Sequence, residues 1–96
     1  MITSQYVVEY TKFAAKQASK LPKEIKEALV FWKESVERLG LPEVRKAKGY
    51  HDEPLKGNRR GQRSIKLNRS YRVIYEEHSA GELVIVGVQE VNKHDY

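Results

Sequence analysis

Residues 22–39 read PKEIKEALVFWKESVERL and form the most regular stretch of the chain. Its large apolar residues recur every three or four positions. They are Ile25, Leu29, Trp32, Val36 and Leu39. This spacing predicts an amphipathic helix with a single apolar stripe that faces a core. Gly40 and Pro42 follow and predict that the helix ends at this point.

A strand and a shorter helix are expected before this stretch. Residues 6–10 read YVVEY, and their aromatic and β-branched side chains favour a strand. Thr11 is a suitable N-cap for a helix that carries Phe13, Ala14, Ala18 and Leu21 on one face. Pro22 ends that helix and fits the first turn of the next one.

The second half of the chain is typical of strands. Residues 62–67 and 71–76 flank a tight turn at 68–70, and a second turn is expected at 79–81. Residues 83–88 read LVIVGV, which predicts a central strand covered on both faces. Residues 41–60 have no sustained period and indicate a connecting loop with a helical turn near 43–46. We therefore expect an α+β fold, with an N-terminal strand and two helices packed on a small, mainly antiparallel sheet.

Length and composition limit the kind of protein this is. The 96 residues suit one domain, 1–96. The absence of cysteine excludes a disulfide scaffold, a thiolate metal site and a thiol nucleophile. No apolar run approaches the ~18 residues of a membrane span and no signal peptide is evident, so we expect a cytoplasmic protein. The net charge of +5 favours an anionic partner, either nucleic acid or an acidic protein.

The positive charge is concentrated in one segment. Residues 56–72 contain seven basic residues and no acidic one. They are Lys56, Arg59, Arg60, Arg63, Lys66, Arg69 and Arg72. If helices cover the face that carries Ile65 and Leu67, strand alternation places Lys66 on the opposite, open face. The turn at 68–70 can set a register that places Arg72 on the same open face. Two such cations suit a phosphodiester, although an ordinary solvated face has the same composition.

The three histidines do not form a metal site in the sequence. His51 and His94 each have acidic neighbours, but three strands separate them and zinc needs three or four convergent ligands. We expect no metal and no cofactor. His94 and Tyr96 end the chain, and an imidazole exchanges protons near neutral pH, but spacing alone favours an ordinary frayed terminus.

Several segments together resemble a known family. They are Glu53-Pro-Leu-Lys-Gly57, Gly61-Gln-Arg-Ser-Ile-Lys-Leu67, Tyr71-Arg-Val-Ile-Tyr75 and the ending Glu90-Val-x-x-His94-x-Tyr96. With the order of helices and strands, they resemble the RelE/ParE superfamily of toxins from type II toxin–antitoxin modules. The similarity covers nearly the whole chain and is strongest to the RelE, YoeB and HigB type of mRNA interferase.

The resemblance implies cleavage of mRNA in the ribosomal A site, by attack of a 2′-hydroxyl on the neighbouring phosphate without a metal ion. It implies Glu53 as the base, Arg72 and Lys66 as the phosphate clamp, and His94 as the acid, with Tyr96 positioning the RNA base. Asp95 separates His94 from Tyr96, which are adjacent in YoeB-like toxins. We assign the acid to His94, because a phenol holds its proton more tightly than an imidazolium.

The resemblance also implies partners. Lys56 and Arg63 would hold the rRNA or mRNA backbone, and the rest of the basic segment, Arg59, Arg60 and Arg69, is expected to bind RNA with them. A cognate antitoxin, acidic and partly disordered, would wrap the basic face. Two alternatives stay open: a ParE-like inhibitor of gyrase without nuclease chemistry, and a small basic domain that binds nucleic acid without cutting it.

Overall fold

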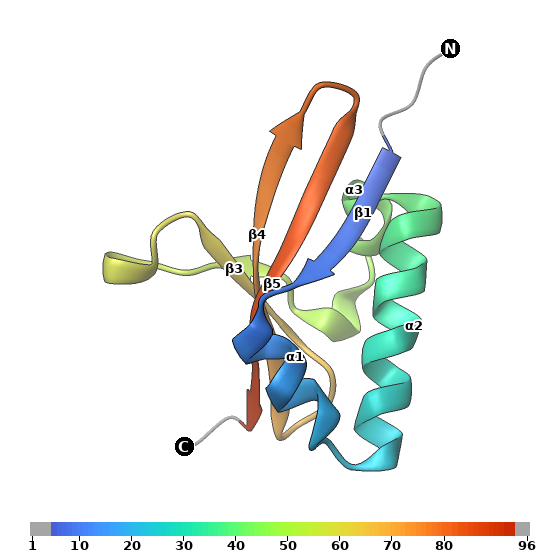
Figure 1. The fold of residues 1–96 in the computed structure, drawn as a ribbon, viewed down its shortest axis with the longest axis vertical. Coiled ribbons are helices and arrows are strands. Elements are labelled where there is room, and N and C mark those ends of the chain that lie inside the picture. Colours follow the sequence, from blue (N-terminus) through green and yellow to red (C-terminus); the bar gives the residue numbers. More distant parts are fainter. Residues whose placement is uncertain (1–4, 94–96) are drawn as a thin grey trace.

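The computed structural model describes residues 5–93, and Figure 1 shows the arrangement of its helices and strands. In chain order these are β1 (Gln5–Tyr10), α1 (Lys12–Ser19), α2 (Lys23–Leu39), α3 (Leu41–Val44), β2 (Glu53–Pro54), β3 (Gln62–Lys66), β4 (Tyr71–Ala80) and β5 (Leu83–Lys93). The strands form one sheet in the order β1-β5-β4-β3-β2. Only the β1–β5 pair is parallel. The expected α+β fold with a mainly antiparallel sheet is confirmed.

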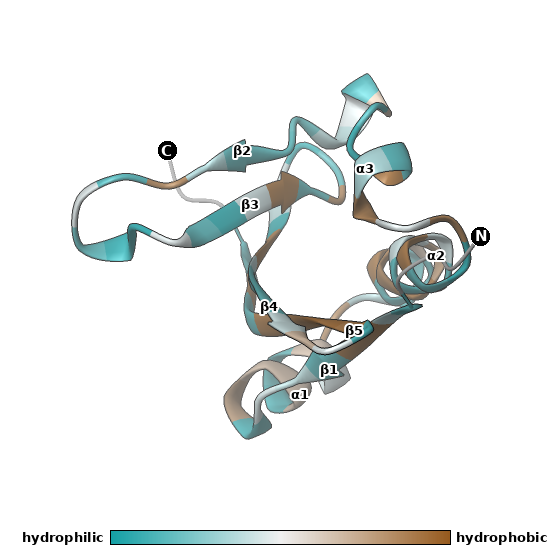
Figure 2. Cartoon of the chain, turned by 90° about the horizontal axis from the view of Figure 1, so that it is seen from above, coloured by the Kyte–Doolittle hydropathy of each residue, from teal (hydrophilic) through white to brown (hydrophobic). Residues whose placement is uncertain are grey.

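The sheet is curved around its helices. Figure 2 shows β2 and β3 turned away from the plane of β5 and β1, with α2 and α3 on the concave side. Helix α2 packs mainly against β1, and α1 packs against β5. In the described part of the chain, no helix is long and apolar enough to cross a membrane.

The helix boundaries follow the local signals. The Thr11 hydroxyl accepts a hydrogen bond from Ala14 N–H at 3.0 Å, as expected of an N-cap. Helix α2 starts after Pro22 and ends at Gly40, whose φ of 87° is the left-handed backbone that glycine tolerates best. Leu39, the last residue of the predicted apolar stripe on α2, is exposed instead of buried. The chain turns at Gly40, and Leu41 packs into the core in its stead.

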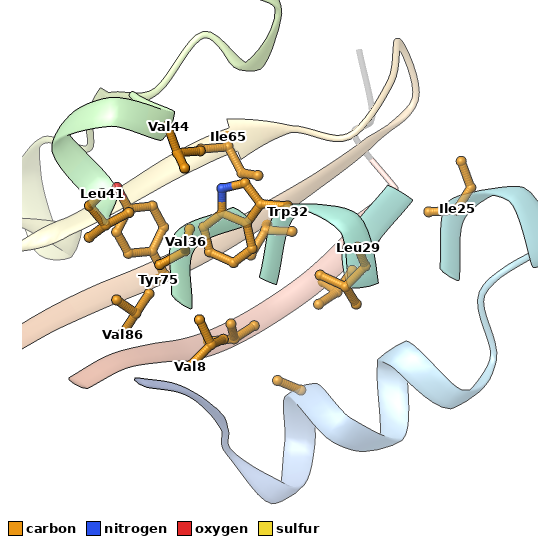
Figure 3. Packing of buried hydrophobic residues seen from close by; sticks show 14 of the residues in the cluster. Val8, Ile25, Leu29, Trp32, Val36, Leu41, Val44, Ile65, Tyr75 and Val86 are labelled. Atoms are coloured by element: carbon orange, nitrogen blue, oxygen red, sulfur yellow. The ribbon is translucent and has the colours of Figure 1, made fainter. Parts of the chain in front are cut away.

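The core is centred on Trp32 of α2. Its ring lies 5.6 Å from that of Tyr75 on β4, tilted by 50°, and both side chains are fully buried. Figure 3 shows Val36 beside this pair, with Val44 and Ile65 above it. Helix α1 contributes Ala14 to the core. Phe13, expected on the same buried face, is exposed.

Strand β1 is held to α2 by a side chain as well as by packing. Glu37 Oε2 accepts a hydrogen bond from Val8 N–H at 3.0 Å, and its other oxygen accepts one from Lys33 Nζ at 3.0 Å. Burial alone would raise the pKa of Glu37. The hydrogen bond from Val8 and the charge of Lys33 outweigh burial and lower the pKa.

The strands β4 and β5 are longer than the sequence predicts. Strand β4 continues to Ala80, through the first two residues of the expected turn, because it pairs with the start of β5. Strand β5 continues past Val88 through a bulge: Tyr75 lies opposite Val88 and Ile74 opposite Glu90, which leaves Gln89 as an extra residue. The expected end was read from the continuous apolar run, which stops at Val88 just before the bulge.

Candidate nucleic-acid interface

Lys66 and Arg72 lie side by side on the sheet. They are directly opposite each other in the β3–β4 pair, and opposite residues of an antiparallel pair share a face. The turn between the strands supports this register, because Asn68 Oδ1 accepts hydrogen bonds from Ser70 N–H and Tyr71 N–H, both at 2.8 Å. Ile65 points to the core and is buried, whereas Lys66 is exposed. The expected placement of both cations on the open face is confirmed.

These cations line a pocket of about 200 Å³. The residues around it are His51, Glu53, Ser64, Lys66, Asn68, Arg69, Tyr71 and Arg72. Glu53 belongs to β2 and lies opposite Ser64 of β3, so the β2–β3 pairing places its carboxylate on the same face as Lys66. Three sequence-predicted catalytic residues, Glu53, Lys66 and Arg72, are therefore brought together in one pocket.

Arg72, which lines this pocket, has a buried donor without a partner in the described part of the chain. Its Nε atom is buried and has no hydrogen-bond partner within residues 5–93. A buried donor without a partner costs about 1–3 kcal/mol. Because Arg72 lines the pocket and guanidinium groups match the oxygens of a phosphate, its side chain suits an anionic ligand there.

A buried carboxylate anchors the wall of the pocket. The side chain of Asp52 is only 2% exposed. It accepts hydrogen bonds from Arg63 Nε at 2.6 Å and from the Tyr75 hydroxyl at 2.5 Å, and Arg45 Nε lies 3.5 Å away. These contacts attach the segment before β2 to β3, β4 and the end of α3.

Two groups beside Asp52, Tyr75 and Arg45, have pKa values shifted from their ordinary ones. Burial raises the pKa of the Tyr75 hydroxyl, and the hydrogen bond to Asp52 raises it further. Burial opposes the charge of Arg45, but its interactions with Tyr75, Asp52 and Glu77 outweigh burial and raise its pKa. At neutral pH the Tyr75 hydroxyl therefore keeps its proton and Arg45 keeps its charge beside Asp52.

The remaining predicted RNA-binding residues have different surroundings. Arg63 points to Asp52, away from the face of Lys66 and Arg72. Arg59 is paired with Glu90 and Gln62. Arg69 lines the pocket, and Lys56 and Arg60 are exposed. Their role in binding RNA stays a prediction.

The predicted catalytic residues His94 and Tyr96 lie outside the described residues. Strand β5 ends at Lys93, which lies opposite the pocket residue Tyr71. The last described residue is therefore next to the pocket.

Sequence reasoning missed the contribution of His51 and Asp52. It noted both only as a possible metal cluster, because nothing in the local pattern shows that residues 53–54 pair with β3. One signal was available. Alternation along an extended segment places Glu53 and Asp52 on opposite sides, but it gives no side for His51, whose backbone is left-handed.

The pocket combines groups that can act together on a phosphodiester. Lys66 and Arg72 can hold phosphate oxygens, and Glu53 and His51 can exchange protons. This combination suits either binding or cleavage of a nucleic-acid backbone.

Comparison with known proteins gives a structural match without a sequence match. No protein-family model and no curated protein matches the chain. Among solved structures, it is similar to the YoeB/ParE toxin from Agrobacterium tumefaciens (TM-score 0.72, 17% identity, 93% of this chain and 99% of that chain covered). It is similar to YafQ from E. coli strain BL21(DE3) (TM-score 0.71, 18% identity, 94% of each chain).

The chain is also similar to a chain of the toxin–antitoxin complex RelBE2 from Mycobacterium tuberculosis (TM-score 0.67, 23% identity, 94% of this chain and 99% of that chain). These similarities span almost the whole of each chain. The protein therefore has the fold of RelE/ParE-type toxins.

Proposed function

We propose that this protein is the toxin of a type II toxin–antitoxin module and acts as a ribosome-dependent mRNA endonuclease. The observation that carries the proposal is the placement of Glu53, Lys66 and Arg72 around one pocket on a toxin fold. An inhibitor that acts only by binding has no need for a base and two phosphate-binding cations in the same pocket.

The reaction we propose is an intramolecular transfer at phosphorus. Glu53 accepts the proton of a 2′-hydroxyl, whose oxygen attacks the neighbouring phosphorus. Arg72 and Lys66 stabilise the charge of the five-coordinate phosphorus. The bond from phosphorus to the 5′-oxygen breaks, and that oxygen takes a proton from His94, with Tyr96 positioning the base. The products are a 2′,3′-cyclic phosphate and a free 5′-hydroxyl, and the steps involve no metal ion or cofactor.

The ribosome would present the message to this pocket. In the proposal, Lys56, Arg59, Arg60, Arg63 and Arg69 contact the backbone of 16S rRNA or mRNA, while the A site holds the scissile phosphate in line. The pocket is lined by charged and polar residues, so it supplies the chemistry, and the ribosome supplies most of the substrate orientation.

An antitoxin is the second partner we propose, acting in the cytoplasm with the ribosome. The net charge of +5 favours an acidic partner. Helices α1 and α2 also expose large apolar side chains, namely Phe13, Val30 and Phe31, and such residues often mark interaction surfaces. The similar RelBE2 structure is a toxin–antitoxin complex.

The test is to map new 5′ ends of mRNA after adding the purified protein, with and without ribosomes. We expect cuts only on ribosomes. Arg72→Ala should lower the single-turnover rate by about 10²–10³-fold, because a main stabiliser of the transition state is lost. Arg38→Ala removes the same charge from an exposed position on α2 and should cleave like wild type.

Two outcomes would contradict the proposal. If the protein leaves ribosome-bound mRNA intact and inhibits DNA supercoiling by gyrase, it is a ParE-like inhibitor. If it binds RNA in a salt-sensitive way without cutting it, it is only a basic RNA-binding domain.

A further inference from the structure

We propose that His51 is the group that takes the 2′-hydroxyl proton, with the Glu53 carboxylate stabilising the imidazolium that forms. This role rests on the proposed nuclease function and deepens it, and it replaces Glu53 as the acceptor of that proton in the reaction described above. Glu53 remains essential, but as the partner of the base.

The backbone at His51 is unusual. Its φ of 47° and ψ of 49° place it in the left-handed region, and it is the one residue other than glycine with a positive φ in the described part. Such conformations cost about 1–3 kcal/mol and cluster at functional sites, where the surrounding structure maintains them.

The structure around His51 maintains this conformation. Its own N–H donates to Lys48 O at 3.1 Å. The next residue, Asp52, is fixed in the core by Arg63 and Tyr75. Asp52 points inward, whereas His51 and Glu53 on either side of it both line the pocket.

The imidazole of His51 is exposed and makes no hydrogen bond or ion pair with any residue between 5 and 93. It is therefore available to a ligand. The titratable groups that share the pocket with it come from every adjoining element. They are Glu53 on β2, Lys66 on β3, Arg69 in the turn, and Tyr71 and Arg72 on β4.

The chemistry favours an imidazole over a carboxylate as the base. A general base works best when its affinity for protons matches the working pH, and histidine is the side chain that changes charge nearest neutrality. In the step we propose, neutral His51 accepts the proton as the 2′-oxygen bonds to phosphorus. The Glu53 carboxylate faces the resulting positive charge, and His51 returns the proton to water after cleavage.

The position of His51 also suits an in-line reaction. His51 and Glu53 lie on the β2 side of the pocket, whereas β5 ends next to Tyr71 on the β4 side. Since the attacking and leaving oxygens lie on opposite sides of phosphorus, a base on the β2 side leaves the β4 side of the pocket for the leaving oxygen.

The experiment measures single-turnover cleavage of ribosome-bound mRNA from pH 5.5 to 9. His51→Asn is the main variant, because asparagine tolerates left-handed backbone and should leave the fold intact. We expect a rate about 10²–10⁴-fold lower, with the low-pH limb of the wild-type profile removed. The matched control His78→Asn changes an exposed histidine on β4, outside the pocket, and should keep the wild-type rate and profile.

A second variant separates a chemical role from a structural one. His51→Gly keeps the positive φ and leaves space, so free imidazole in the buffer should restore part of its cleavage rate. The inference is overturned if His51→Asn cleaves like wild type with an unchanged profile, or if imidazole fails to restore His51→Gly. Either result, with Arg72→Ala still defective, leaves the proposed function intact. A wild-type protein that never cuts mRNA overturns both.

Discussion

Replacing Asp52 with alanine tests how the pocket wall is held. The substitution removes a carboxylate that is 2% exposed and accepts hydrogen bonds from Arg63 at 2.6 Å and from Tyr75 at 2.5 Å. A hydrogen bond to a charged group contributes about 1.5–3 kcal/mol, and the two share one acceptor, so their contributions do not simply add.

The decrease in the free energy of unfolding should lie near the lower end of the range for a broken buried ion pair, which is about 3–5 kcal/mol. The side chains of Arg63 and Arg45 are 26% and 32% exposed, so water can partly solvate them once Asp52 is gone. We expect a decrease of about 3 kcal/mol in the free energy of unfolding. For a chain of this size that is a large part of the total, roughly 5–14 kcal/mol, and corresponds to a Tm lower by roughly 12–24 °C.

The measurement is urea unfolding at pH 7, followed by circular dichroism, with thermal unfolding as a second probe. Glu77→Ala is the matched control, because Glu77 also pairs with Arg45, at 3.3 Å, but is 38% exposed. It should cost less than about 1 kcal/mol, as surface pairs do. If Asp52→Ala costs no more than Glu77→Ala, the carboxylate does not anchor the segment and our account of the pocket wall is wrong.

Two further predictions concern the helix side of the fold. Because the pKa of Glu37 is lowered, its hydrogen bond with Val8 stabilises the protein fully at pH values above the ordinary carboxyl pKa of 4.5. This stabilisation is lost as the pH falls through the folded-state pKa of Glu37. Glu37→Gln should thus lower the free energy of unfolding by about 1 kcal/mol at pH 7 and by progressively less as pH falls below 4.5, and a difference independent of pH would contradict this. Gly40→Ala should destabilise the protein by about 1–3 kcal/mol, because φ is 87° and an added Cβ would lie 3.0 Å from the Tyr6 ring. Gly49→Ala, where a Cβ has open space, should change stability little in the same urea titration, and equal effects at both glycines would refute the strain argument.

The class of fold was predictable because its main signals are local. The 3.6-residue period of α2 and the alternation of β3 each depend on residues a few positions apart. The placement of Lys66 and Arg72 followed from alternation and one short turn. The prediction failed where a position depends on what packs beside it, as for Leu39 and Phe13, which are exposed despite lying on predicted apolar faces.

The candidate site was predictable only in part. Glu53, Lys66 and Arg72 came from motif resemblance, and the structure brings them into one pocket. His51 was not recognised as a member of this site, because its place there depends on the short β2–β3 pairing and on a left-handed backbone. Neither feature produces a periodic pattern in the sequence.

The sequence by itself determined the two long helices, the approximate positions of β1, β3, β4 and β5, and which residues of β3 and β4 share a face, because these properties are set by neighbours along the chain. Only the tertiary structure decided that Asp52 is buried while the residues on either side of it face a ligand pocket. The reason is that its partners Arg63 and Tyr75 are 11 and 23 positions away and lie on two other strands. Their donors compensate for burying a charge that the sequence alone would leave in water.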